Sequence, residues 1–385
     1  MEKYLIILIS FLLMQPLKAQ DLAHRLDSLL GTSYQLERSQ CGLMVYDLTA
    51  DSGVYTYNHR QTMRPASTMK LLTAITAIDV LGGSYLLRTS LYYKGDISNR
   101  TLTGDLYLVG GMDPRFNNDD LTAFIESLRR LGVDTIRGNI VADRSFKDED
   151  PFGEGWCWDD DNPVLSPLLL NRKDQLVERF VARLREDGAV VDANIMAGNL
   201  PSGSRHVCTR SHAIEQVLNR MLKDSDNLYA ECLFYQIAAG TGNHPAKATH
   251  ARNAIRKLIQ RAGLYPGDYK IADGSGLSLY NYVSAELLVR LLRYAWRNSN
   301  VIENLLPALP IAGQDGTLEN RMKGKSTAGN VRAKTGTLTG ISSLAGYCTA
   351  ANGHVLCFSI INQGILQHSE GRSFQDRVCI ALCEE

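Results

Sequence analysis

The segment "SSLAGYCTAANGHVLCFSIINQ", residues 342–363, contains two runs of apolar and β-branched residues around the triplet Ala351-Asn352-Gly353. Such a pattern is typical of two antiparallel strands joined by a tight turn. A second pattern of this kind, "CGLMVYDLTADSGVYTYN", occupies residues 41–58 near the other end of the chain. Segments with helical periodicity lie between the two. The sequence therefore predicts an α+β fold whose sheet unites both ends of the chain.

Most of the remaining chain shows helical spacing of apolar residues or helix-capping signals. The segment 91–114 is different, because alternating residues and turn signals predict short strands there. The expected helices cover residues 21–30, a segment that begins at Ser67, and residues 118–132, 174–188, 211–239, 251–262, 284–298 and 373–385.

The composition is that of a globular protein. Of the 385 residues, 44% are hydrophobic and 21% are charged, which excludes an intrinsically disordered chain. The 41 basic and 41 acidic side chains balance. Because nucleic acids and anionic membranes attract proteins with a basic excess, we expect neither as a partner.

The N-terminus has the pattern of a secretory signal peptide. Lys3 precedes an apolar run over residues 4–14, and Ala19 offers a small residue for cleavage. The run is short for a membrane span, and no second apolar stretch of that length follows. We therefore expect residues 1–19 to be removed and the mature protein to be exported, periplasmic and soluble, without integral membrane association. An anchor that stays uncleaved is the alternative.

The eight cysteines are scattered and form no Cys-x-x-Cys pair of the kind that binds zinc. An oxidising compartment would permit disulfides, but most of these cysteines are better explained as small core residues. The sequence predicts no metal site and no cofactor.

The segment "RPASTMKLLTAI", residues 64–75, places Ser67 three residues before Lys70 at the start of a predicted helix. Residues three apart lie on one side of a helix, so the two side chains should be neighbours. A serine beside an unprotonated lysine is one form of activated nucleophile. The alternative for this motif alone is a capping serine followed by a solvated lysine.

Two further triplets favour the catalytic interpretation. Ser225-Asp226-Asn227 lies within the predicted helical segment 211–239, and Lys334-Thr335-Gly336 lies on a predicted strand. Each triplet is weak evidence alone. The order S-x-x-K, S-D-N, K-T-G, with each motif in a suitable element, is characteristic of penicillin-binding proteins and serine β-lactamases.

With these motifs the sequence resembles the low-molecular-mass class C penicillin-binding proteins, a family of D-alanyl-D-alanine carboxypeptidases and endopeptidases. The resemblance covers residues 40–363 and includes "GDLYLVGGMDP", "GWCWDD", "DGSGLS" and "KTGTLTGISSLAGY". It implies a five-stranded antiparallel sheet flanked by helices, with a domain inserted between S-x-x-K and S-D-N. We expect a catalytic domain of residues 20–84 and 204–385 and a shortened insertion of residues 85–203.

The resemblance also implies roles for the motif residues. Ser67 would attack the D-Ala–D-Ala carbonyl of a peptidoglycan stem peptide, and Lys70 would accept its proton. Ser225 would relay the proton to the leaving amine, and Asn227 would hold the substrate amide. Penicillins and other β-lactams would acylate the same serine and act as covalent inhibitors. Lys334 and Thr335 would bind the terminal carboxylate, Gly336 would leave the strand bare for an extended peptide, and the backbone N–H groups of Ser67 and Thr337 would form the oxyanion hole.

Three departures from the family concern substrate recognition and not the motifs. The insertion is shorter than in typical relatives, and Met112 replaces a usual glycine in "GGMDP". Relatives that read a diaminopimelate side chain carry arginine after "DGSGLS" and often glutamine after "KTG-x-L", where this chain has Leu279 and Thr339. Recognition of the third residue of the stem peptide should therefore differ.

Two other functions fit parts of the pattern. A β-lactamase would need a deacylation base, commonly a glutamate well after S-D-N, but no glutamate lies between Glu231 and Glu286. A non-catalytic peptidoglycan-binding module would be expected to have lost at least one motif, and all three are intact. A serine-type D-Ala-D-Ala peptidase is therefore the preferred interpretation.

Overall fold

The computed structural model describes residues 21–33, 38–159 and 161–385, so the expected signal peptide, residues 1–19, lies outside the described residues. The chain divides into two compact units. The first comprises residues 1–75, 222–225 and 256–385, and the second comprises residues 76–221 and 226–255. The second unit extends beyond the segment 85–203 expected for the insertion. Units defined by contacts need not coincide with domains, and the domain boundaries expected from the sequence stay a prediction.

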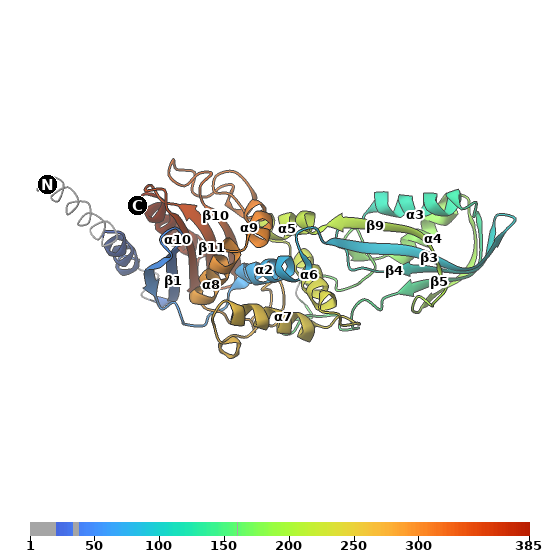
Figure 1. The fold of residues 1–385 in the computed structure, drawn as a ribbon, viewed down its shortest axis with the longest axis horizontal. Coiled ribbons are helices and arrows are strands. Elements are labelled where there is room, and N and C mark those ends of the chain that lie inside the picture. Colours follow the sequence, from blue (N-terminus) through green and yellow to red (C-terminus); the bar gives the residue numbers. More distant parts are fainter. Residues whose placement is uncertain (1–20, 34–37, 160) are drawn as a thin grey trace, which may run out of the picture. The chain divides into compact units, whose positions relative to one another are not determined.

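The first unit contains a five-stranded sheet in the order β10-β11-β12-β1-β2, with every neighbouring pair antiparallel. Strand β12 pairs with β1, from Gln40 opposite Gln363 to Asp47 opposite Leu356. The two ends of the chain therefore share one sheet, which confirms the predicted fold class (Figure 1). The strands are β1 (Gln40–Asp47), β2 (Ser52–Tyr57), β10 (Arg332–Leu338), β11 (Ile341–Thr349) and β12 (Val355–Gln363).

Helices cover both faces of this sheet because side chains alternate between the faces along each strand. Leu344 and Phe358 belong to a core that also contains Phe374 of α10. On the opposite face, the Tyr347 hydroxyl donates to the carbonyl of Leu292 in α8 at 2.8 Å. The helices are α8 (Ala285–Trp296), which Ser284 caps as predicted, and α10 (His368–Cys383).

The second unit has its own five-stranded sheet, in the order β8-β5-β4-β3-β9. Strand β4 pairs with β5 and β5 with β8 in parallel, and the other pairs are antiparallel. Helices α3 and α4 contribute to the core of this unit. The elements are β3 (Leu86–Ser98), β4 (Thr101–Val109), α3 (Asn118–Arg130), β5 (Thr135–Asp143), α4 (Leu176–Glu186), β8 (Val190–Ala197) and β9 (Arg205–Ala213) (Figure 1).

The expected helix over residues 211–239 is wrong at its start and in its middle. Residues 211–213 complete strand β9, and the chain leaves helical geometry between α5 and α6 at Ser225, whose φ is +61°. The remaining elements are α2 (Met69–Leu81), β6 (Leu169–Leu170), β7 (Lys173–Asp174), α5 (Ile214–Lys223), α6 (Asn227–Gly240), α7 (Ala248–Arg261) and α9 (Ser299–Ala308).

All eight cysteines are free thiols, and six of them are buried, in agreement with their expected role as core residues. In the part of the chain that the structure describes, no group of three or more His, Cys, Asp or Glu side chains could hold a metal ion. None of the described helices has the length and apolar character needed to cross a membrane.

Candidate active site

Ser67 lies in a short 3-10 turn, Ala66–Thr68, that directly precedes α2. The expected α-helix therefore begins two residues later, at Met69, because Ala66 adopts a left-handed φ of +49°. The Thr68 hydroxyl donates to the Pro65 carbonyl at 2.7 Å, and the Ser343 hydroxyl of β11 donates to the same carbonyl at 2.6 Å. The turn that presents Ser67 is thus tied to the sheet.

Lys70 is completely buried at the start of α2. Its Nζ lies 2.9 Å from the Ser67 hydroxyl and donates to the Ser275 carbonyl at 2.8 Å. The predicted proximity of the two side chains is confirmed, and the alternative of a solvated lysine is wrong. A buried amine in contact with a hydroxyl is an arrangement that can take the hydroxyl proton.

The loop that carries Ser275 is organised by the buried carboxylate of Asp273. This carboxylate accepts hydrogen bonds from the backbone N–H groups of Gly276 at 2.8 Å and Ser278 at 2.7 Å, and from the Asn281 amide at 2.7 Å. These bonds fix the carbonyl that Lys70 contacts. The block "DGSGLS" contains Ser275, but the motif does not indicate that the backbone carbonyl of this residue contacts Lys70.

Lys334 of β10 is the second buried lysine of the first unit. Its Nζ donates to the Ser225 hydroxyl at 2.9 Å and to the Thr335 carbonyl at 2.8 Å. Burial, followed by the positive charge of Lys70, holds the pKa of Lys334 well below its ordinary value. The structure therefore places Ser67, Lys70, Ser225 and Lys334 in one unit, with the two lysines close enough to influence each other's charge.

Three further residues that the sequence assigns to the site are Thr335, Thr337 and Asn227, and they lie on two different elements. The Thr335 hydroxyl donates to that of Thr317 at 2.8 Å, a partner that the sequence motifs did not indicate. Thr337 is exposed on β10 opposite Ser342. Asn227 is the first residue of α6 and belongs to the second unit, so its catalytic role stays a prediction.

Two glycines enclose the turn that presents Ser67. A Cβ atom at Gly276, whose φ is +82°, would lie 1.9 Å from the Ala66 carbonyl oxygen. A Cβ atom at Gly336 would lie 2.2 Å from the Ser343 hydroxyl and 3.0 Å from the Ser67 nitrogen. Gly336 is therefore required by the fold itself, whereas the motif alone suggested that it leaves room for the substrate.

We expect Gly336→Ala to reduce the rate of penicillin acylation and to destabilise the protein by about 1–3 kcal/mol, as overpacking of a close contact does. The measurements are fluorescent-penicillin labelling and chemical denaturation. Gly53→Ala on β2 is the matched control, because its Cβ would meet nothing within 4 Å. Equal acylation rates and equal stabilities of the two variants would contradict the close contact that we infer at Gly336.

In the second unit, the middle residue of the S-D-N motif is held by two arginines. The buried Asp226 carboxylate accepts hydrogen bonds from Arg172 and, at 3.3 Å, from Arg220. Both guanidinium groups lie over the Tyr229 ring, with their central carbons 5.7 and 5.8 Å from its centroid. The same carboxylate accepts from the Tyr229 N–H at the start of α6. Asp226 is thus a structural residue that fixes the start of this helix.

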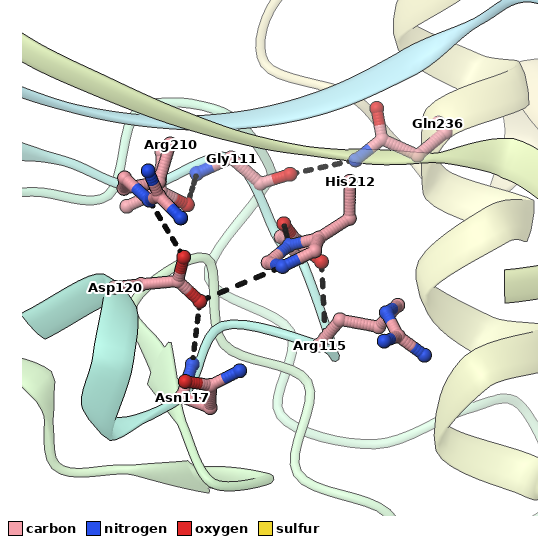
Figure 2. A network of polar contacts seen from close by, with 9 residues as sticks. Gly111, Arg115, Asn117, Asp120, Arg210, His212 and Gln236 are labelled. Carbon is pink, nitrogen blue, oxygen red and sulfur yellow. Dashed lines mark hydrogen bonds and ion pairs between the residues drawn. The ribbon is translucent and has the colours of Figure 1, made fainter. Parts of the chain in front are cut away.

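A polar network inside the second unit joins β9 to the start of α3 (Figure 2). The His212 Nδ1 lies 2.6 Å from a buried Asp113 oxygen, and its Nε2 lies 3.6 Å from Asp120. Figure 2 shows the Arg210 guanidinium meeting Asp120 as well, at 2.7 Å. The hydrogen bond that His212 donates to Asp113 raises the pKa of His212 above its ordinary value, although burial and the charge of Arg115 oppose this shift. The network neutralises two buried carboxylates.

The raised pKa of His212 predicts how stability depends on pH. Its protonated form is favoured in the folded state, so its contribution is complete below the pKa of the unfolded chain and is lost as pH rises through the folded pKa. We expect the free energy of unfolding to fall between pH 6 and pH 9 more steeply in the wild type than in His212→Gln. His206→Gln on the same strand is the control in urea denaturation, and identical slopes for all three proteins would contradict the prediction.

Comparison with known proteins gives a consistent result. A model of the D-Ala-D-Ala carboxypeptidase 3 (S13) family matches residues 22–170 and 165–382. The D-alanyl-D-alanine carboxypeptidase of Actinomadura sp. (strain R39) is 26% identical in an alignment that covers 91% of this chain and 82% of that protein. The D-alanyl-D-alanine carboxypeptidase DacB of Haemophilus influenzae is 25% identical, over 84% of this chain and 85% of that protein.

Among solved structures, penicillin binding protein 4 (dacB) from Haemophilus influenzae superimposes with a TM-score of 0.86 at 22% sequence identity. The match covers 94% of this chain and 99% of that one. Another structure of that protein, in complex with a β-lactam, gives a TM-score of 0.80. At this level of identity the likeness establishes the fold: a penicillin-binding, β-lactamase-like core.

Proposed function

The chain belongs to the D-Ala-D-Ala carboxypeptidase 3 (S13) family and is a serine-type D-Ala-D-Ala peptidase; we propose that it works through an acyl-enzyme on Ser67. The observation that carries this proposal is the 2.9 Å contact between the Ser67 hydroxyl and the completely buried Lys70 amine. A serine acquires nucleophilic strength when an adjacent base removes its proton.

The first half of the proposed reaction follows from this contact. The Ser67 Oγ attacks the carbonyl carbon between the two D-alanines, and Lys70 takes the hydroxyl proton. The C–N bond then breaks, and the leaving amine receives a proton. Ser225 is suited to relay that proton, because its hydroxyl is held by the Lys334 ammonium at 2.9 Å. The acyl-enzyme is hydrolysed by water, which restores Ser67.

Lys334 is the proposed binding group for the carboxylate of the terminal D-alanine. Its pKa is lowered by burial and by Lys70, so an incoming carboxylate would stabilise the charged form of Lys334. The Thr335 hydroxyl, already oriented by Thr317 at 2.8 Å, would add a hydrogen bond. We further propose that Asn227 holds the substrate amide and that the N–H groups of Ser67 and Thr337 stabilise the oxyanion.

Recognition of the third residue of the stem peptide is expected to be weak. Leu279 and Thr339 provide neither the charge nor the amide that diaminopimelate readers carry. Arg64 lies beside Leu279, since its Nε donates to the Leu279 carbonyl at 3.0 Å. We predict similar kcat/KM values for stem peptides with and without the carboxylate on the third side chain. A strong preference for the carboxylate that is lost in Arg64→Gln would contradict this and assign its recognition to Arg64.

We propose peptidoglycan stem peptides as substrates and β-lactams as covalent inhibitors of the same serine. Export of the mature protein to the periplasm is part of this proposal and is supported by the N-terminal sequence pattern. The fold and motifs fit both release of a terminal D-alanine and cleavage of a crosslink, because the two reactions differ only in the leaving amine.

The test is incubation of purified protein with crosslinked and uncrosslinked muropeptides, followed by identification of the products by mass. Loss of one alanine from an uncrosslinked pentapeptide indicates carboxypeptidase activity, and conversion of dimers to monomers indicates endopeptidase activity. Neither product with the wild type would overturn the proposal.

A further inference from the structure

A pocket of about 410 Å³ lies on the first unit between α7, α8 and α9, and it shares no residue with the site around Ser67. Its lining contains four guanidinium groups and no carboxylate among the described residues. Arg290 and Arg293 lie on α8, Arg297 directly follows this helix, and Arg261 ends α7. The lining residues that matter here are Arg261, Arg290, Arg293, Tyr294, Arg297 and Ser299.

Four like charges around one pocket are unfavourable unless anions offset them, because like-charged side chains three and four residues apart repel. The structure supplies part of the compensation through Asp51 in the β1–β2 turn. Its carboxylate accepts hydrogen bonds from Arg293 at 2.7 and 3.0 Å and from Arg297 at 2.5 Å. Asp51 lies outside the lining of the pocket, so the guanidinium faces that line it still attract an anion.

Arg290 is only weakly compensated by acidic side chains. Its Nε is buried and has no hydrogen-bond partner among the described residues. Its terminal nitrogen lies only 3.8 Å from Glu286, too long for a hydrogen bond. The side chain as a whole is 36% exposed, so its terminal nitrogens, unlike the buried Nε, can reach an anionic oxygen in the pocket.

The N-terminus of α9 adds to the positive potential. Asn298 precedes the helix without a side-chain capping hydrogen bond, and its first turn contains no acidic residue. Asn298 and Ser299 both line the pocket. The positive end of a helix dipole and its unpaired N–H groups favour a bound anion.

We propose that this pocket binds a phosphate ester. Planar guanidinium groups form paired hydrogen bonds with phosphate oxygens, and several arginines around one site favour phosphate over a single carboxylate. The volume exceeds that of a phosphate group and leaves room for an attached sugar. The exposed lining is about equally polar and apolar, and Ala262 and the Tyr294 ring, over which Arg261 lies, are among its apolar groups. A sugar presents both kinds of surface and fits this lining better than an acyl chain, so the proposed ligand is a sugar phosphate.

The test is calorimetric titration of the full chain with inorganic phosphate, glucose 6-phosphate and uncharged glucose. We expect glucose 6-phosphate to bind more tightly than phosphate, and glucose not to bind. The double variant Arg290→Gln/Arg297→Gln should weaken binding by about tenfold or more, the effect of one lost charge-assisted hydrogen bond. Arg256→Gln is the control, because Arg256 is an exposed arginine of α7 outside the pocket.

A gain of affinity offers a second readout. Asp51→Asn should strengthen glucose 6-phosphate binding, because it removes the carboxylate that competes for Arg293 and Arg297. Asparagine tolerates the left-handed φ of +53° at this position. Thermal unfolding of each variant and its muropeptide hydrolysis, expected to be unchanged, separate loss of binding from loss of fold or of the proposed activity.

Absence of binding by every phosphate probe at millimolar concentration would overturn the proposal. So would equal affinity of the wild type and the double arginine variant. Binding to phosphatidylglycerol vesicles, but not to phosphatidylcholine vesicles or to glucose 6-phosphate, would contradict the sugar phosphate and assign the pocket to a lipid headgroup.

Discussion

Ser67→Ala is expected to abolish covalent labelling by fluorescent penicillin and to lower muropeptide hydrolysis by a factor of about 10⁴–10⁶. The variant removes the oxygen atom that forms the acyl bond. The smaller alanine side chain does not displace the buried Lys70 beside it. The substitution of Ser67 by alanine removes only the hydroxyl group. It eliminates the nucleophile without altering the turn, because alanine fits the same backbone.

Ser369→Ala, an exposed serine at the start of α10, is the control and should be labelled like the wild type. Labelling is read by gel fluorescence and by the mass of the intact protein. A penicillin adduct of unchanged mass and yield on the Ser67→Ala variant would show that another residue is acylated, and the proposed mechanism would then be wrong.

The second large effect is expected from Lys70→Met, which keeps the length and burial of the side chain but removes the amine. If Lys70 takes the proton of Ser67, the rate of penicillin acylation should fall by about 10²–10⁴, the usual contribution of a general base. The fold should survive, because methionine is an apolar side chain of similar length at a completely buried position.

Lys257→Met on the exposed face of α7 is the matched control. Stopped-flow or quenched labelling gives the acylation rates, and thermal unfolding checks the fold. Acylation of Lys70→Met at the wild-type rate would assign the general base to another group, and Lys334, whose pKa is lowered, would be the first to test.

The sequence was sufficient for the sheet of the first unit and for α8 and α10, because these elements carry strong local signals, but it did not indicate α9. The two hairpins alternate apolar residues around turn triplets, and Ser284 caps α8 as predicted. The second sheet was harder. Strand β8 has exposed apolar residues such as Ile195 and Met196, so no buried face marks it as a strand. Strand β9 was partly assigned to a helix for the same reason.

The candidate site was predictable in its residue types but not in its supports. The S-x-x-K motif placed Lys70 beside Ser67, and the structure agrees. The Ser275 carbonyl that also contacts Lys70, and the Thr317 hydroxyl beside Thr335, lie in loops whose sequence blocks do not specify these contacts. Backbone acceptors and hydroxyl pairs depend on tertiary packing, so one sequence cannot reveal them.

The two glycines that enclose the Ser67 turn bear on antibiotic resistance. A target enzyme escapes a drug when a substitution harms the drug's reaction more than the enzyme's own. Any side chain at Gly276 or Gly336 would collide with the turn that carries Ser67, and the proposed peptide and β-lactam reactions both need that serine in place. Substitutions at these glycines should therefore cost peptide hydrolysis as much as drug acylation, so we do not expect viable resistance to arise at either position.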